Sequence, residues 1–416
     1  MLCADGLQTR PMKLMTLTNQ DSTVGLAADQ IRHVTQPISD LEQLRSLMPV
    51  IREDGVYLDH AAAGVLPQPV IDAMSNRIHS AASHGVRHWN HWQKLVHRTR
   101  KLVAELIGGH EDEVAFVPNT ASGIGIVAEG FRWQSGDNVV LPAAEFPSNR
   151  FPWLNLNRRG VEVRQVDAPD DPDGCVSALD EACDSNTRII ACSWVDYGTG
   201  VRRDPARLAE VAHRHGGLLV LDAIQGMGVL PLELHAQEVD VVVADSRKWL
   251  LGPDGAGILA IRRDQQNLFE VTRPGWASTV DPLNFGATEL QFSPTATRFE
   301  SGMHNTFGLT GLHASLSVFR DISPSAREQR LLSVRNDFED AGRSAGMECP
   351  LLPESAQSGI LSFNHPLRES TQLIRQLRAH AITVSLKKDR VRVSPHFYNN
   401  ADDVRQFKDA LCSILG

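Results

Sequence analysis

One stretch of the chain holds three side chains whose types and spacing could do chemistry together. The apolar run 218–221 leads directly into Asp222, and Gln225 follows shortly after it. A second apolar run, 239–244, precedes Lys248. A lysine amine can bond covalently to a carbonyl group, and a buried acid can keep a pyridine nitrogen protonated so that the ring withdraws electrons. The three residues therefore suit a pyridoxal phosphate site.

The elements that must position these residues form an alternating pattern. Short apolar runs predict strands, and the segments between them predict helices. Strands are predicted at 113–117, 138–141, 160–166 and 188–193 and in the two runs above, with a helix at 206–215. This alternation continues to about residue 262 and is typical of an α/β fold in which helices cover both faces of a parallel sheet. Ligands bind such sheets at the carboxyl ends of the strands, where the polar residues fall.

The N-terminal flank predicts three helices. Ser39 would cap the first, with Glu42 at the capping-box position and Pro49 at its end. A helical pattern then covers residues 70–107 with a break near Gly85. Between them, small residues at 61–64 permit a close approach of two backbone segments.

The C-terminal flank predicts a smaller α+β unit. Helices are expected at 309–319, 325–346, 370–380 and 402–415, and strands at 359–363, 382–385 and 391–394. We therefore divide the chain into an extension with the first helix at 1–45, a large domain at 46–310 and a small domain at 311–416.

Composition and charge restrict the class of protein. The chain has 416 residues, of which 42% are hydrophobic, and a net charge of -9, which argues against nucleic acid as the main partner. The six cysteines have no regular spacing, as is usual for reduced thiols in a cytoplasmic protein. The first 25 residues are too polar for a membrane span, and we assign no structure to residues 1–38.

Two further clusters could bind ions. Five histidines fall in the helical region 70–107, but no carboxylate or cysteine joins them at ligand spacing, so we predict no metal site. They are His79, His84, His88, His91 and His97. Residues 119–122, Asn-Thr-Ala-Ser, follow a predicted strand and open a helix. Backbone N–H groups at such a helix start can bind an anion.

From Tyr57 onward the chain resembles the class V aminotransferase family of fold type I pyridoxal phosphate enzymes. This family includes cysteine desulfurases, selenocysteine lyases, isopenicillin N epimerase and kynureninase. The matching segments, in order, are YLDHAAAG, FVPNTASGI, EFPSN, LVLDAIQ, SRKWLLGP, RFESGMHNT and RVSPHFYN. The resemblance implies a large domain with a mainly parallel seven-stranded sheet, a smaller C-terminal α+β domain, and a homodimer with the active site at the subunit interface.

The resemblance also implies roles for individual residues. Lys248 is similar to the lysine that carries the cofactor, Asp222 to the acid on the pyridine nitrogen, and Gln225 to the residue bonded to the phenolic oxygen. Phe146 stands where desulfurases keep a ring-stacking histidine, and its aromatic face preserves the stacking. The implied phosphate contacts are Thr120, Ala121, Ser122, Ser246 and Arg247. Those implied from the second subunit are Trp276, Asn305 and Thr306, and those to substrate are Arg392, Tyr197 and Ala62.

Some positions depart from the family pattern. Ala121 and Met303 replace phosphate-binding hydroxyl residues, and Asp245 would repel a phosphate dianion unless Arg247 or His304 intervenes. Desulfurases that form a persulfide carry a cysteine shortly before the final arginine, whereas residues 381–394 contain none.

We therefore expect a carbon–sulfur lyase for a cysteine- or cystine-type amino acid that uses no persulfide-forming cysteine. The first alternative is an amino-acid epimerase or aminotransferase, and the second alternative is a catalytically quiet cofactor-binding protein. We expect no membrane or nucleic-acid partner.

Overall fold

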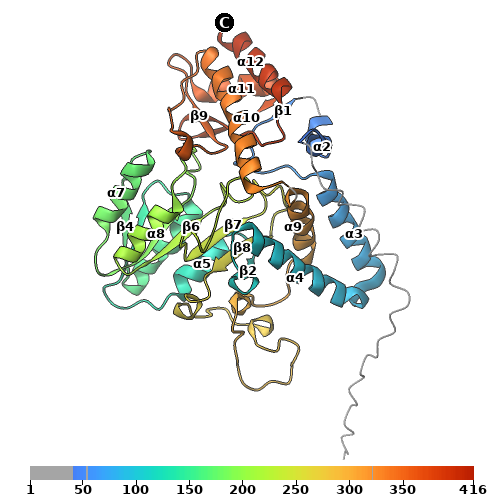
Figure 1. Ribbon diagram of the computed structural model, residues 1–416, viewed down its shortest axis with the longest axis vertical. Coiled ribbons are helices and arrows are strands. Elements are labelled where there is room, and N and C mark those ends of the chain that lie inside the picture. Colours follow the sequence, from blue (N-terminus) through green and yellow to red (C-terminus); the bar gives the residue numbers. More distant parts are fainter. Residues whose placement is uncertain (1–40, 53–54, 321) are drawn as a thin grey trace, which may run out of the picture. The chain divides into compact units, whose positions relative to one another are not determined.

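The computed structural model describes residues 41–52, 55–320 and 322–416 (Figure 1). The predicted cap at Ser39 lies outside these residues. The helix that would follow it, α2 (Leu41–Ser46), ends before Pro49, as predicted. No helix in the described residues is long and apolar enough to cross a membrane.

A seven-stranded sheet forms the centre of the fold, in the order β2-β8-β7-β6-β5-β3-β4. The strands are β2 (Val114–Val117), β3 (Asn138–Pro142), β4 (Glu162–Val166), β5 (Thr187–Ser193), β6 (Leu218–Asp222), β7 (Val241–Asp245) and β8 (Gly257–Ile261). β8 is antiparallel to both of its neighbours, whereas the other strand pairs are parallel. The predicted α/β fold with a mainly parallel seven-stranded sheet is therefore confirmed.

Helices cover both faces of this sheet because its central strands are apolar on both sides. Leu219 and Leu221 of β6 belong to one hydrophobic core, and Leu218 and Val220 belong to the other. The first core includes α4 (Trp89–Leu106), α7 (Pro172–Ala182), α8 (Pro205–Arg214) and α9 (Thr306–Phe319). The second includes α5 (Thr120–Gly130) and α6 (Phe151–Leu154). The sheet is thus a rigid platform whose strand ends can hold a site.

The predicted helical region at 70–107 consists of two helices. α3 (Gln68–His84) gives way at Gly85 to a short 3-10 turn, η2 (Gly85–His88), and α4 follows. The break falls at Gly85 because its φ of +51° is a conformation that glycine adopts readily. The rings of His84 and His88 stack at 4.0 Å, and the described residues contain no cluster that could hold a metal ion.

The C-terminal elements, orange and red in Figure 1, surround a third hydrophobic core. The helices are α10 (Pro324–Ser344), α11 (Ser370–Ala379) and α12 (Ala401–Leu415). The strands are β9 (Leu361–Phe363), β10 (Ile382–Thr383), β11 (Ser385–Lys387) and β12 (Arg390–Val393), with β12 between β9 and β11. An early strand, β1 (Val56–Tyr57), pairs in parallel with β10. This pairing brings the segment after Tyr57 next to the C-terminal strands.

Candidate functional site

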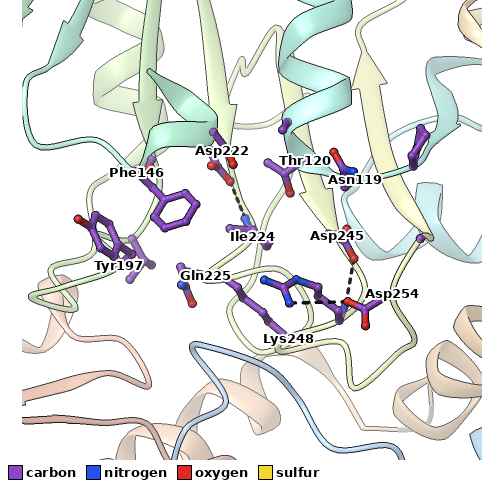
Figure 2. Close-up of a pocket in the computed structure, with 17 residues that line it drawn as sticks. Asn119, Thr120, Phe146, Tyr197, Asp222, Ile224, Gln225, Asp245, Lys248 and Asp254 are labelled. Atoms are coloured by element: carbon purple, nitrogen blue, oxygen red, sulfur yellow. Dashed lines mark hydrogen bonds and ion pairs between the residues drawn. The ribbon is translucent and has the colours of Figure 1, made fainter. Parts of the chain in front are cut away.

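A cavity of about 490 Å³ opens where the strands of the parallel sheet end. Figure 2 shows Asp222, Gln225 and Lys248 around it, with Phe146 and Tyr197 on one side and Asp245 on the other. Asp222 and Asp245 are the last residues of β6 and β7, and the other side chains come from the loops after β3, β5, β6 and β7. The sheet therefore assembles groups that are far apart in the sequence.

Asp222 and Lys248 form the charged centre of the cavity. Asp222, the last residue of β6, is 3% exposed and accepts a hydrogen bond from the Ile224 N–H at 3.0 Å. Burial raises the pKa of Asp222 to about 7, and the charge of Glu145 acts in the same direction. Burial lowers the pKa of Lys248 to about 7, with contributions from Arg392 and Arg247, although Asp222 opposes the shift. The site thus provides a lysine amine that is partly neutral near pH 7, beside an acid that can hold a proton.

Gln225 is fixed at both ends of its amide group. Its Nε2 donates to the carbonyl oxygen of Ala61 at 3.0 Å, and its Oε1 accepts from Trp249 Nε1 at 2.8 Å. The predicted close approach at 61–64 is also present, because the Gly64 N–H donates to the Arg247 carbonyl at 2.7 Å. A Cβ at Gly64 would lie 2.2 Å from the carbonyl oxygen of Lys248, so this contact requires glycine.

Two aromatic rings form one wall of the cavity. The ring centroids of Phe146 and Tyr197 are 5.1 Å apart in an edge-to-face arrangement. Lys248 Nζ lies 5.9 Å from the centroid of Phe146. Phe146 therefore presents a π surface near the lysine amine, as a ring-stacking residue must.

The start of α5 provides groups for an anion. The side chain of Asn119 caps this helix by accepting from the Ser122 N–H at 2.9 Å. Thr120 lines the cavity, and its buried Oγ1 finds no hydrogen-bond partner among the described residues. An unpaired hydroxyl beside a helix N-terminus fits a phosphate group. Ala121 also lines the cavity.

Asp245 and Arg247 lie on the opposite side of the cavity. Asp245 Oδ1 accepts from the Arg247 N–H at 3.1 Å, and burial raises the pKa of Asp245. Arg247 Nη1 lies 3.7 Å from Asp254 Oδ1. The buried hydroxyl of Ser246 donates instead to the Pro253 carbonyl at 2.5 Å, so it is already occupied. His304 pairs with Glu300 at 2.8 Å rather than with Asp245.

Arg392 lies beside the cavity without lining it. Its Nη1 donates to the Tyr197 carbonyl at 2.9 Å, and its Nη2 contacts Asp59 Oδ1 at 3.0 Å. The residue is 1% exposed. Arg392 can bind the carboxylate of a substrate only if the substrate reaches its guanidinium group beyond Tyr197.

The remaining predicted contacts lie outside this cavity. Ser122 and Asn305 line a second cavity of about 400 Å³, whereas Ala62, Trp276 and Thr306 line neither of the two. Trp276 is 38% exposed, and Thr306 Oγ1 accepts from Arg77 Nη2 at 2.8 Å. Within a single chain, therefore, Trp276, Asn305 and Thr306 do not line the first cavity, although Asn305 Nδ2 donates to the carbonyl of its lining residue Gly255 at 3.0 Å.

Sequence reasoning missed Glu145. Its buried carboxylate accepts from the Ser193 N–H at 2.7 Å and from the Ser193 hydroxyl, and burial raises the pKa of Glu145. Because Ser193 lines the cavity, Glu145 holds one residue of the cavity wall in place. The available signal was an acid four residues after the end of the predicted strand 138–141 and directly before Phe146.

Comparisons with known proteins identify the family of the chain. The family profile described as "Aminotransferase class-V" matches residues 56–407. A "Probable cysteine desulfurase" of Methanothermobacter thermautotrophicus is 30% identical over 401 residues, which cover 90% of this chain and 98% of that protein. "Cysteine desulfurase CsdA" of Escherichia coli is 29% identical and covers 72% of this chain and 76% of that protein.

Solved structures share the fold. The apo structure of a cysteine desulfurase from Thermococcus onnurineus has a TM-score of 0.80 at 23% identity, over 90% of this chain and 98% of that one. The cystine C–S lyase C-DES, in complex with its reaction product cysteine persulfide, has a TM-score of 0.79 at 22% identity. That match covers 86% of this chain and 97% of the lyase.

Proposed function

The chain belongs to the class-V aminotransferase family, and from that premise we propose that it breaks the carbon–sulfur bond of a cysteine- or cystine-type amino acid by elimination. As a member of this family it is a pyridoxal phosphate enzyme. The cavity fits the cofactor, because it combines a lysine with a lowered pKa, a buried acid, an aromatic face and the unpaired hydroxyl of Thr120.

When bound, pyridoxal phosphate supplies an electron-withdrawing ring that stabilises the negative charge left when the substrate loses its α-proton. Lys248 is the group that takes this proton, since its pKa of about 7 leaves a substantial fraction of neutral amine at neutral pH. Asp222 would hold a proton at the pyridine nitrogen, and the remaining amide N–H of Gln225 would be available to the phenolic oxygen. Phe146 would cover one face of the ring.

The observation that carries the proposal is the tight hairpin before Arg392. β11 and β12 are joined by Lys388 and Asp389 alone, and residues 381–394 hold no cysteine. The nearest upstream thiol is Cys349, which is 9% exposed within the C-terminal core and whose pKa burial raises. Among the described residues this loop therefore offers no thiolate for attack on a substrate sulfur, and elimination needs none.

The test is product analysis on the holoenzyme with cysteine, cystine and their sulfoxides. We expect pyruvate together with a released sulfur species, and we expect a Cys349→Ser, Cys412→Ser double variant to turn over at the wild-type rate. A persulfide found by mass spectrometry on a cysteine of the protein would contradict the mechanism. Deuterium entering the α-position without elimination would instead favour the epimerase or aminotransferase alternative, and an unresponsive cofactor spectrum would favour the quiet protein.

The enzyme is further proposed to act as a homodimer whose active sites lie at the subunit interface. Trp276 and Thr306 do not line the cavity of their own chain. Near them, Met303 is 59% exposed, Phe307 is 40% exposed and Phe285 is 79% exposed. Exposed apolar side chains of this size favour a protein partner, and a second copy would bring the same residues to this site.

A further inference from the structure

Lys388 lies at the tip of the β11–β12 hairpin in a conformation that non-glycine residues rarely adopt. Its φ is +48°, and that of the next residue, Asp389, is +56°. Two successive left-handed residues form the tight turn that hairpins favour, but Asn-Gly or Asp-Gly is the usual pair at such positions. A lysine that is kept in this conformation indicates that its side chain has a function.

The side chain of Lys388 crosses from this hairpin to the wall of the cavity. Its Nζ lies 3.3 Å from Asp196 Oδ2 and 5.9 Å from the ring centroid of Tyr197. Its aliphatic stem passes over Gly198, where a Cβ would lie 2.9 Å from the Lys388 Cδ. Only 28% of the lysine side chain is exposed. The lysine therefore packs against the turn that carries Tyr197.

This turn is held firmly on the other side as well. Asp196 Oδ1 accepts from the N–H groups of Gly198 at 2.9 Å and Thr199 at 2.7 Å. The Tyr197 carbonyl accepts from Arg392 Nη1 at 2.9 Å. Burial would raise the pKa of Asp196, but Lys388 and Arg203 lower it below the ordinary value. The backbone of the turn is thus fixed by hydrogen bonds, and the lysine ammonium lies within cation–π range of the aromatic ring.

We propose that Lys388 is a specificity-determining residue that pins the Tyr197 ring against Phe146 and so fixes the wall facing the substrate side chain. The inference rests on the proposed function only in taking this cavity as the amino-acid site. With the wall fixed, compact side chains fit between the ring and the floor of the cavity. Bulky side chains require Tyr197 to move away, which costs its contact with the lysine.

The chain offers a matched control for this lysine. Lys387, the preceding residue, carries the same charge on the same hairpin. It makes no side-chain hydrogen bond, ion pair or ring contact with any part of the chain that the structure describes. Lys387→Met therefore removes one positive charge without touching the wall. Lys388→Arg keeps the cation and should preserve the selectivity.

Gly198→Ala provides a second route to the same effect. The added methyl group would displace the lysine stem while leaving its charge in place. Because Gly198 does not have a positive φ, alanine adds no backbone strain there. Agreement between Lys388→Met and Gly198→Ala would therefore show that the placement of the cation at Tyr197 matters, rather than the net charge of the hairpin.

The experiment has a binding arm that requires no turnover. L-Alanine and L-phenylalanine carry no leaving group for elimination, and their binding to the holoenzyme is followed by the absorbance of the cofactor. In Lys388→Met and Gly198→Ala we expect the preference for alanine over phenylalanine to fall by about three- to tenfold. This is the effect predicted for losing both the cation–π contact with Tyr197 and the ion pair with Asp196. In Lys387→Met and Lys388→Arg it should stay at the wild-type value.

A structural arm of the experiment tests whether Lys388 holds the Tyr197 ring in place, even if neither amino acid binds. The sequence contains only three tyrosines, so 3-fluorotyrosine labelling gives three ¹⁹F signals, and Tyr197→Phe identifies the one from the wall. We expect that signal to shift in Lys388→Met and to stay in place in Lys387→Met. An unmoved signal overturns the inference, as does a moved signal with an unchanged preference. If no amino acid perturbs the wild-type cofactor, the proposed function fails, whereas the pinning of Tyr197 stands or falls on the ¹⁹F signal.

Discussion

At the residue scale, the site depends on two groups whose pKa values burial shifts in opposite directions. Lys248 and Asp222 each have a pKa of about 7, although their ordinary values are 10.5 and 3.8. Neither shift helps the folded protein by itself, since burial disfavours both charges. In the proposed site a bound cofactor would remove both costs, because Lys248 would bond to its carbonyl carbon and its pyridine nitrogen would give Asp222 a cationic partner.

The apo protein should therefore be least stable near pH 7 as far as these two groups are concerned. Between pH 3.8 and about 7 the folded state holds an extra proton on Asp222, so stability falls as pH rises. Between about 7 and 10.5 the unfolded state holds an extra proton on Lys248, so stability rises with pH. From about pH 7 to pH 9 we expect a gain on the order of 2 kcal/mol. Urea unfolding of the apo protein at the two pH values measures this gain in the free energy of unfolding. The apo Lys248→Met variant is the control and should not show the gain.

A second residue-scale prediction concerns the orientation of Gln225. A tryptophan N–H can only donate and a carbonyl can only accept, so Trp249 and Ala61 together fix which end of the amide is which. Trp249→Phe leaves the Gln225 oxygen without its donor. We expect the cofactor to dissociate at least about fivefold more readily, as the loss of one buried hydrogen bond implies.

Trp194→Phe is the control for this change. Trp194 is equally buried and contacts the neighbouring Gly226, but its Nε1 has no acceptor among the described residues. Both variants lose a similar volume in the core. Cofactor affinity is measured by fluorescence titration of the apo protein. Equal losses in the two variants would refute a role for the Trp249 hydrogen bond.

At the element scale, the hairpin between β11 and β12 stores a small amount of backbone strain. Asp389 has a φ of +56°, and its side chain makes no hydrogen bond or ion pair with the described residues. Glycine adopts this conformation without steric cost. Asp389→Gly should raise the free energy of unfolding by about 0.5 kcal/mol. Urea denaturation of the holoenzyme tests this, and a lower midpoint would show that the aspartate contributes in some other way.

Most of the sheet could be predicted from the sequence because each buried strand is an uninterrupted apolar run that ends in polar residues. The direction of β8 could not, since a short apolar run does not specify its neighbours. α7 was missed because it opens with Pro172, Asp173 and Gly174, which are typical of a turn. In the structure Asp171 caps it by accepting from the Gly174 N–H at 2.7 Å, and Val176 and Leu179 pack into the core.

The site was predictable to a similar extent. Asp222, Gln225 and Lys248 follow two neighbouring strands directly, so their convergence follows from the topology of the sheet. The ion pair between Arg392 and Asp59 could not be predicted, because the two residues lie 333 positions apart. An isolated parallel bridge between Asp59 and Ser394 brings their segments together. The domain boundaries drawn from the sequence stay predictions. β1 already joins the C-terminal elements by pairing with β10.

At the scale of the whole molecule, the site of one chain is proposed to need a second copy. If Trp276 acts across the interface, a Lys248→Ala chain and a Trp276→Ala chain can complement each other, since a mixed dimer then has one site with both residues intact. Random mixing of equal amounts makes half of the dimers mixed, so we expect about a quarter of wild-type turnover from two nearly inactive variants. If Trp276 acts within its own chain, no site in the mixture is complete, and turnover stays at the level of the separate variants. Unfolding and refolding the variants together, followed by assay with cystine, distinguishes the two cases. Sedimentation velocity of the same mixture confirms that dimers have formed, so that a failure of assembly is not mistaken for action within one chain.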